Sequence, residues 1–298
     1  MNKSKILIAC FNLFLYTNCI AEFNNMEEKL FIGFLNLDKP QGPTSHDVCM
    51  IVKRILNVNK TSHSGTLDPM VSGVLVMGIG KAARLLRFLP SGKEYVGVMD
   101  IHEDIDQKKI EKTIKEHFLG KIKQTPPVKS RVKREERERE IYSFNILEKR
   151  GRKVLFKVHC QAGTYIRKLC SDLGEKLGIG AHMLELRRTK AGIFEEKDSL
   201  TLYQVQDLIE KYKKGDNEIL KHIIPMEIVA NHLPNIHVKK ENTARILNGS
   251  PIFEEFIEKK DKLEKGIFAA IISEKKLLEI AKVVLEGKVI AVPETVLN

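Results

Sequence analysis

The apolar residues of this chain change their pattern near Leu233, and that change limits the folds that the chain can adopt. Before this point, apolar runs of strand length alternate with stretches whose apolar positions recur at helical spacing, which indicates a mixed α+β domain. After it, short apolar runs are separated by glycines and charge clusters, which indicates a small β-rich domain. We therefore expect two domains, over residues 26–230 and 231–298, preceded by a doubtful extension or leader over residues 1–25.

The expected elements of the first domain follow from apolar spacing and from breakers such as Asp38–Pro43. Helices are predicted from a cap at Thr44 or Ser45 through Leu56, and over Lys81–Leu89, Gln107–Leu119, Thr164–Leu177 and Leu202–Lys213. Strands are predicted over Leu30–Leu37, Val71–Gly80, Glu94–Ile101, Ile141–Leu147, Val154–Cys160 and Ala181–Arg188. Those of the second domain are expected around Ile236–Val238, Ile267–Ile272, Leu278–Val284 and Val289–Val292.

Charge and cysteine content narrow the class of protein. Lys and Arg total 50 against 39 Asp and Glu, a net charge of +11 that favours a polyanionic partner, with nucleic acid ahead of an anionic membrane surface. The 5 cysteines are widely spread without a CxxC pair, so reduced and mostly buried thiols are expected. The sequence has no metal-ligand cluster, Walker loop or dinucleotide fingerprint.

The first 25 residues differ from the rest of the chain. Lys3 and Lys5 precede an apolar run over Ile6–Tyr16, a pattern that resembles a secretory signal peptide but is short for a membrane span. Three interpretations stay open: an overextended start with Met26 as the first residue, an ordered or floppy extension, or a working signal. The rest of the chain contains no apolar run of membrane-spanning length, and we expect a cytoplasmic protein without a membrane partner.

Two short stretches contain residues that are typical of catalytic sites. In His63–Pro69, Gly65 permits a sharp turn and Pro69 stiffens the chain, so Asp68 is held in a fixed loop where a carboxylate can act as a nucleophile. The alternative is a simple turn former. Arg167 falls in the first turn of a predicted helix, where the helix dipole does not favour a cation, so a buried carboxylate is its natural partner. The alternative is a surface arginine.

Two predicted strands offer further candidates. Tyr95 opens a strand and could stack on a base, although a core tyrosine with a satisfied hydroxyl is an equal alternative. In Glu185–Arg188, strand alternation points Leu186 away from Glu185 and Arg187, which is also what an ordinary amphipathic strand would do.

The combination of five motifs resembles the TruB and dyskerin family of RNA pseudouridine synthases. In family order they are LDKPQGPTSH at Leu37–His46, HSGTLDP at His63–Pro69, GKEYVG at Gly92–Gly97, AGTYIR at Ala162–Arg167 and GAHMLELRR at Gly180–Arg188. The resemblance implies a mixed, mainly antiparallel sheet with flanking helices as the catalytic domain. It also implies that the second domain is a small β-barrel-like PUA domain that binds RNA.

Within the family the chain resembles the archaeal and eukaryotic guide-RNA branch more than bacterial TruB. The interval between Tyr95 and Gln124 is short, and TPPVKSRVKR at Thr125–Arg134 is similar to that branch. Because the Lys-rich tails of eukaryotic dyskerin are missing, the resemblance points to the archaeal catalytic subunit of an H/ACA ribonucleoprotein. The N-terminal 25 residues match nothing in the family, and the chain stops soon after the last PUA-like strand, which leaves the completeness of that domain open.

The resemblance implies roles for individual residues and no cofactor. Asp68 would be the catalytic carboxylate that attacks C1′ or triggers deprotonation at C2′, Arg167 would pair with it, and Tyr95 would stack on the flipped uracil. Pocket contacts with the substrate are expected from His63, Leu186, Tyr165 and Lys39, and for Lys39, the looser candidate, a phosphate contact and a structural contact both stay open. Contacts with the RNA backbone are expected from Lys129, Arg131, Lys133, Arg134, Arg187 and Arg188.

The expected partners are guide RNA, an rRNA or tRNA substrate and small H/ACA proteins. Three alternatives stay open at this point: a stand-alone synthase that acts on the T-loop of tRNA, a non-catalytic RNA scaffold or chaperone and, as the remotest, a secreted or surface basic protein.

Overall fold

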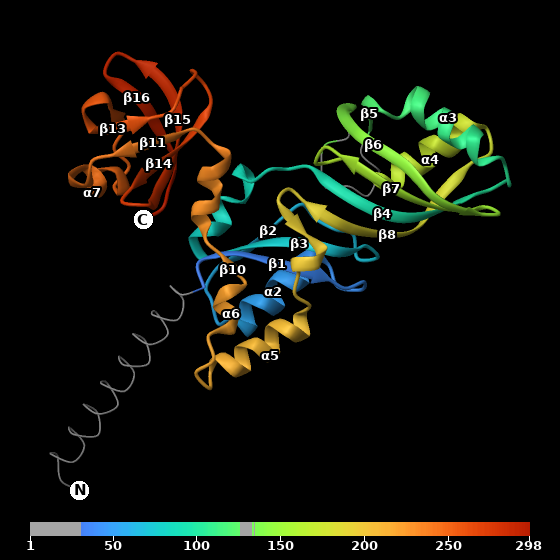
Figure 1. The fold of residues 1–298 in the computed structure, drawn as a ribbon, viewed down its shortest axis with the longest axis horizontal. Helices are drawn as coiled ribbons and strands as arrows, with labels where there is room; N and C mark the ends of the chain where they lie inside the picture. Colours follow the sequence, from blue (N-terminus) through green and yellow to red (C-terminus); the bar gives the residue numbers. More distant parts are fainter. Residues whose placement is uncertain (1–30, 126–132, 134) are drawn as a thin grey trace, which may run out of the picture.

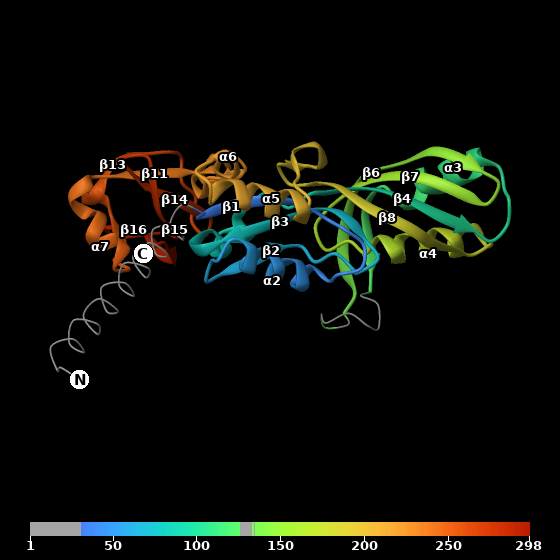
Figure 2. The same ribbon diagram turned by 90° about the horizontal axis from the view of Figure 1, so that it is seen from below.

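The computed structural model describes residues 31–125, 133 and 135–298. Three parts of these residues follow one another in a row in both views (Figures 1 and 2). A C-terminal sheet lies at one end, β1, β3, α2 and α5 lie in the middle, and β4 to β7 with α3 and α4 lie at the other end. The extension over residues 1–25 lies outside the described residues.

In the part of the chain that the structure describes, a 10-stranded sheet runs through the middle and far parts, in the order β10-β1-β3-β8-β4-β7-β6-β5 with β2 beside β3 and β9 beside β8. All its pairings are antiparallel except the short one between β3 and β8. The strands are β1 Gly33–Lys39, β2 Thr61–Ser64, β3 Ser72–Ile79, β4 Lys93–Ile101, β5 Gly120–Gln124, β6 Arg137–Arg150, β7 Lys153–Cys160, β8 Ala181–Ala191, β9 Phe194–Glu195 and β10 Ile223–Ile224. The predicted fold class is confirmed.

Helices cover the sheet in two groups. Around β1 and β3, α2 (Ser45–Ile55), α5 (Leu202–Tyr212) and α6 (Glu218–Lys221) bury apolar residues such as Val52, Val205 and Ile219. Around β4, β7 and β8, α3 (Gln107–His117) and α4 (Ile166–Leu177) bury Ile110 and Leu173 with Phe156. Each helix is amphipathic, so burial of its apolar face stabilises it on the sheet.

The predicted helix starts are confirmed at α2 and corrected at α4. Thr44 caps α2: its hydroxyl accepts a hydrogen bond from the Asp47 amide, and the Thr44 amide in turn donates one to the Asp47 carboxylate, which satisfies two otherwise unpaired donors. Thr164 does not cap α4, because its hydroxyl donates to the carbonyl of Gln161 and the helix begins at Ile166 after Tyr165.

Short or polar elements account for the other differences from the predicted secondary structure. The helix predicted over Lys81–Leu89 is two 3₁₀ turns, η1 (Gly80–Arg84) and η2 (Leu86–Phe88). Strand β6 extends well beyond Ile141–Leu147 at both ends, because its charged residues alternate between half-buried and exposed positions and still pair with β5 and β7. The strands β2, β5, β9 and β10 are short or polar and were not predicted, and β2 includes His63 and Ser64 of the expected loop His63–Pro69.

The C-terminal residues form a curled 6-stranded sheet in the described part of the chain, in the order β12-β16-β15-β14-β11-β13. Its strands are β11 Asn235–Val238, β12 Ile252–Phe253, β13 Ile257–Lys260, β14 Phe268–Ser273, β15 Lys276–Glu286 and β16 Val289–Val296, with α7 (Thr243–Leu247) beside β15. The apolar runs predicted there lie in β11, β14, β15 and β16, except that β14 begins at Phe268, one residue after the predicted Ile267.

This sheet packs against the middle of the molecule. The ring of Phe88 in η2 meets that of Phe268 edge to face, with centroids 5.2 Å apart, and Arg87 forms an ion pair with Glu294. Apolar residues of η4 (Met226–His232), including Val229, join the same cluster as Ile280 of β15.

Three of the cysteines lie in the described residues, and Cys49, Cys160 and Cys170 are free and buried there, as predicted. In the same residues, no helix combines the length and apolarity that a bilayer crossing requires.

Candidate active site

Asp68 lies in the loop between β2 and β3, and both ends of this loop are fixed by hydrogen bonds. On one side, the Ser45 hydroxyl donates to the Leu67 carbonyl at 3.1 Å and accepts from the Leu67 amide at 2.8 Å. On the other side, the Gly42 amide donates to the Pro69 carbonyl at 2.9 Å. Asp68 is therefore held between the start of α2 and the end of β1, which confirms a fixed loop.

The carboxylate of Asp68 forms an ion pair with the guanidinium of Arg167, on the first turn of α4. The two residues are 99 positions apart in the sequence. The predicted carboxylate partner of Arg167 is confirmed, but it is not buried: 55% of the Asp68 side chain is exposed. A reactive carboxylate must be reached by its substrate, and this exposure leaves Asp68 accessible.

The start of α4 is fixed by a buried glutamine from β5. Gln124 accepts a hydrogen bond from the Tyr165 amide at 3.0 Å and donates to the Tyr165 carbonyl at 3.3 Å. Tyr165 itself is half-buried. Because Gln124 fixes the backbone two residues before Arg167, it sets the position of the guanidinium that faces Asp68.

Strands β4 and β8 place Tyr95, Leu186 and Arg188 near this ion pair. Tyr95 and Arg188 are directly opposite each other in the two strands, and the Arg188 guanidinium donates a hydrogen bond to the Tyr95 hydroxyl. Burial raises the pKa of Tyr95, while Arg188 partly opposes that rise and Asp68 adds to it. Leu186 is buried in the same apolar cluster as Tyr95, as its strand alternation predicts.

Two residues expected to contact RNA are buried instead. Arg188 is 1% exposed, and its guanidinium donates to the Val74 carbonyl at 2.7 Å and the Gly65 carbonyl at 3.0 Å, so the expected contact with the RNA backbone is wrong. Lys39 is fully buried and donates to the carbonyls of Pro40 and Pro69. Of the two roles open for Lys39, phosphate or structural contact, the structure therefore favours the structural one.

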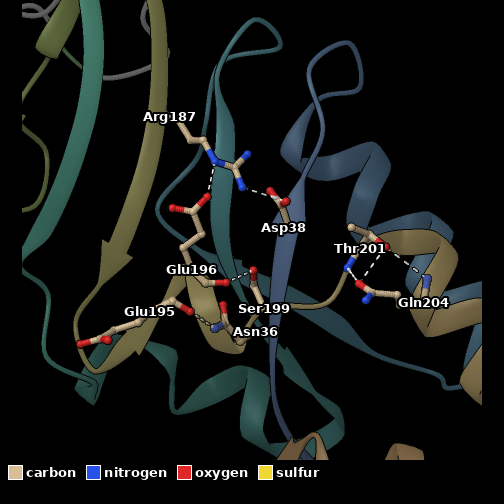
Figure 3. Close-up of polar contacts among 8 residues, drawn as sticks. All are labelled: Asn36, Asp38, Arg187, Glu195, Glu196, Ser199, Thr201 and Gln204. Atoms are coloured by element: carbon tan, nitrogen blue, oxygen red, sulfur yellow. Dashed lines mark hydrogen bonds and ion pairs between the residues drawn. The ribbon is translucent and has the colours of Figure 1, made fainter. Parts of the chain in front are cut away.

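Arg187 is also engaged within the protein (Figure 3). Its guanidinium forms ion pairs with Asp38 of β1 at 2.8 Å and with Glu196 at 2.5 Å, so it joins β1, β8 and the 3₁₀ turn η3 (Glu196–Asp198). Both ion pairs raise the pKa of Arg187, with Asp38 as the largest cause. With 35% of its side chain exposed, Arg187 is foremost a clamp between strands rather than a free cation for RNA.

His63 lies on β2 and is half-buried, and no partner is found for its Nδ1 atom among the described residues. Burial, followed by the positive charge of Arg188 and the neighbouring His46, lowers its pKa. His63 is therefore favoured as a neutral ring beside the catalytic loop.

The other residues expected to contact RNA backbone come from the basic stretch after β5. Lys133 is well exposed and forms an ion pair with Glu135. Lys129, Arg131 and Arg134 lie outside the described residues. These four contacts stay predictions.

Sequence reasoning missed three residues that shape the site: Ser45, Gln124 and Lys93, whose buried side chain reaches the turn at Gly65. Ser45 and Lys93 fall inside stretches that had been singled out, but a residue's type and spacing do not reveal which loop it contacts. Gln124 is the last residue of β5, a strand with alternating lysines whose pairing with β6 cannot be predicted without the tertiary structure.

Family comparisons match the residues that carry this site. Residues 53–166 match "TruB family pseudouridylate synthase (N terminal domain)", and residues 167–230 match "tRNA pseudouridylate synthase B C-terminal domain". The chain belongs to the TruB family of pseudouridine synthases. It is thus an enzyme of RNA modification, one that isomerises uridine to pseudouridine.

Individual relatives agree with this assignment. A Methanopyrus kandleri protein described as "Probable tRNA pseudouridine synthase B" is 47% identical over 252 residues, which cover 84% of this chain and 73% of the relative. A chain of a Cbf5-Nop10-Gar1 complex superimposes with a TM-score of 0.81 and 41% identity, over 92% of this chain and 87% of the other. A chain of an H/ACA ribonucleoprotein bound to a substrate RNA containing 2'-deoxyuridine superimposes with a TM-score of 0.78 and 38% identity, over 92% of this chain and 87% of the other.

Proposed function

We propose that this chain is the catalytic subunit of a guide-RNA-directed H/ACA ribonucleoprotein, and that Asp68 is its catalytic carboxylate. The ion pair between Asp68 and Arg167 is the observation that carries the assignment of Asp68, because it aims an accessible carboxylate from a fixed loop. Tyr95 and Leu186 supply the apolar base of the same site.

The reaction breaks the C1′–N1 bond of uridine and forms a C1′–C5 bond, with no net change in oxidation state. Asp68 either bonds to C1′ or removes a proton at C2′, and both routes require an ionised carboxylate. The ion pair with Arg167 restricts the orientation of this carboxylate. The uracil must leave the RNA stack to reach this loop, which costs a few kcal/mol that protein contacts have to offset.

Guide-directed action is favoured by the structural neighbours. Two of them were solved in complexes described as Cbf5-Nop10-Gar1 and as an H/ACA ribonucleoprotein with substrate RNA. The second candidate is stand-alone action on tRNA, which the descriptions of the curated relatives favour. The excess of positive charge, +11, suits an RNA partner in both cases.

A matched pair of variants tests the role of Asp68. Asp68→Asn removes the charge and should abolish pseudouridine formation by the assembled particle, measured by mass spectrometry of the substrate RNA. Asp207→Asn is the control, because Asp207 has 62% of its side chain exposed and forms an ion pair with Lys211 on α5, in another part of the molecule. Unchanged activity of Asp68→Asn would show that the assignment is wrong.

Reconstitution separates the guide-directed from the stand-alone function. The full chain is incubated with a matched guide RNA and target, with and without small partner proteins, and in parallel with bare tRNA. We expect modification only at the guided uridine and strong dependence on the guide. Full activity of the chain alone on the T-loop would instead establish the second candidate.

A further inference from the structure

Two buried basic side chains lie side by side beneath the catalytic loop. Lys93 of β4 is 5% exposed and Arg188 of β8 is 1% exposed. Both reach the turn at Gly65: a Cβ atom placed there would lie 3.3 Å from Arg188 Nη1, 3.3 Å from Lys93 Cε and 4.0 Å from Lys93 Nζ. The two cations therefore support the loop that carries Asp68 from its buried side.

The two side chains differ in how their charge is compensated. Arg188 donates to the carbonyls of Val74 and Gly65 and to the Tyr95 hydroxyl. Lys93 has neither a hydrogen-bond acceptor nor a carboxylate partner among the residues that the structure describes. Burial is the largest cause that lowers the pKa of Lys93, to about 8, and the neighbouring charge of Arg188 adds to it. At neutral pH, Lys93 is therefore mostly a cation without a counterion.

The groups that face Lys93 do not neutralise it. Cys160 of β7 is directly opposite Lys93, and burial raises the pKa of its thiol to about 11, so the thiol is neutral at pH 7. Tyr95 lies on the same buried face of β4 and is also neutral there. The carboxylate of Glu94 lies on the opposite face, where it binds Lys157. Buried charges are normally paired, so an unpaired one beside a catalytic loop indicates that a negative charge arrives from outside.

The proposed reaction supplies such a charge. When the C1′–N1 bond breaks, its electron pair stays on the uracil, which becomes an anion with charge spread over N1 and its carbonyl oxygens. The C1′–C5 bond then forms with an electron pair of the uracil, C5 loses a proton and N1 gains one, so atoms and electrons balance. The anion exists only between these two bond changes, and it forms whether Asp68 attacks C1′ or removes the C2′ proton.

We propose that Lys93 is a positioning residue which, with Arg188 and across Tyr95, provides a fixed positive potential that stabilises the detached uracil anion. This inference rests on the proposed function of Asp68. A preorganised charge in a site that excludes water stabilises a developing charge without the cost of reorganising solvent. Lys93 does not contact the uracil. It acts through its electrostatic field at the uracil and through the side chain of Tyr95, which the neighbouring Arg188 holds in place by a hydrogen bond.

The test compares two substrates that differ in how well the base tolerates negative charge. Single-turnover cleavage of the C1′–N1 bond is measured with the assembled particle on target RNA containing uridine or 5-fluorouridine, whose base is the more acidic. Lys93→Met, which keeps the length of the stem but not the charge, should slow the reaction on uridine roughly 10- to 100-fold. On 5-fluorouridine the loss should be several-fold smaller, because a more stable anion needs less positive potential.

Two further variants separate the effect of the Lys93 charge from other effects of the substitution. Lys93→Arg keeps the charge and should retain a rate within a few-fold of the unmodified chain on both substrates. Lys157→Met is the matched control, since Lys157 lies on the neighbouring strand β7, is 42% exposed and contacts Glu94 on the other face of β4. It should leave both rates unchanged.

The outcomes distinguish this inference from the proposed function. An equal loss on both substrates, or no loss on either, would overturn the role of Lys93 and leave Asp68 untouched. Retained cleavage in Asp68→Asn would overturn the proposed function whatever Lys93→Met does. Thermal unfolding of Lys93→Met should not occur at a lower temperature than that of the unmodified chain, because the variant buries no unpaired charge. A marked drop in the unfolding temperature of Lys93→Met, together with equal rate losses on both substrates, would assign Lys93 a purely structural role.

Discussion

The guanidinium of Arg167 pairs with the carboxylate of Asp68 across 99 residues of sequence, and both side chains remain more than half exposed. An exposed ion pair contributes little to stability, so its geometry matters more for the chemistry than for the fold. The elements that hold it are buried: Ser45 on one side and Gln124 on the other.

Arg167→Gln should therefore lower the rate of pseudouridine formation far more than the stability. We expect a fall in single-turnover rate of roughly 10²-fold to 10³-fold, as for other charge-stabilising groups of active sites, with a change in RNA affinity of only a few-fold. Tritium release from RNA labelled at C5 of uridine measures the rate, and filter binding measures the affinity. Arg152→Gln, with 58% of its side chain exposed and Asp100 as its partner, is the control. If RNA affinity fell as much as the rate, Arg167 would be a binding residue instead.

The clamp formed by Arg187 should be visible in stability. Arg187→Gln leaves the carboxylates of Asp38 and Glu196 facing each other without a cation, so we expect a loss of about 1–2 kcal/mol in the free energy of unfolding, between the values for exposed and buried pairs. Urea denaturation measures it. Lys197→Gln, which removes an exposed partner of Glu195, should cost almost nothing. Equal losses of unfolding free energy in Arg187→Gln and Lys197→Gln would contradict the interpretation that Arg187 clamps the two strands.

Gly73 should be intolerant of any side chain. It has φ +101° and a Cβ atom there would lie 2.2 Å from the backbone oxygen of Arg188, at the short parallel contact between β3 and β8. Gly73→Ala combines backbone strain with a backbone clash, and we expect a loss of about 2–5 kcal/mol together with reduced activity. Gly120→Ala, with φ +74° and open space, isolates the strain alone and should lose only about 1–2 kcal/mol. Urea unfolding of both variants compares them, and a similar loss in each would show that the clash at Arg188 is unimportant.

Glu279 should make the stability of the C-terminal sheet depend on pH. It is fully buried on β15, neither carboxylate oxygen has a partner among the described residues, and burial raises its pKa from 4.5 to about 8. Between these values the folded chain keeps a proton that the unfolded chain releases, so this group lowers stability progressively as pH rises from about 4.5 to about 8.

Glu279→Gln removes that titration. At pH 8 the variant should be more stable than the unmodified chain by roughly 2–4 kcal/mol, and the difference should vanish near pH 4. Thermal unfolding at several pH values measures it. Glu286→Gln, on the same strand but exposed and paired with Lys265, should show no such dependence. A difference between Glu279→Gln and the unmodified chain that is constant with pH would refute the interpretation.

Much of this molecule follows from local sequence. Apolar period predicts most of the helices and long strands, because a helix or strand must bury one face wherever it lies, and the breakers at Asp38–Pro43 and His63–Pro69 fall where the chain turns. The strands β2, β5, β9 and β10 were not predicted, and the 3₁₀ turns η1 and η2 were predicted as one helix, because elements of two to five residues show too little apolar period and depend on the neighbours that they meet.

By itself, the sequence determined the fold class, the fixed loop that carries Asp68 and the residue types of the site. Only the tertiary structure decided which charged side chains are paired or buried within the protein. Arg167, Arg187 and Arg188 have the same side chain, yet one faces the carboxylate of Asp68, one clamps two strands and one is buried on backbone carbonyls. The reason is that the free energy of a charge depends on its solvation and its partners, and those partners come from strands and loops far away in the sequence.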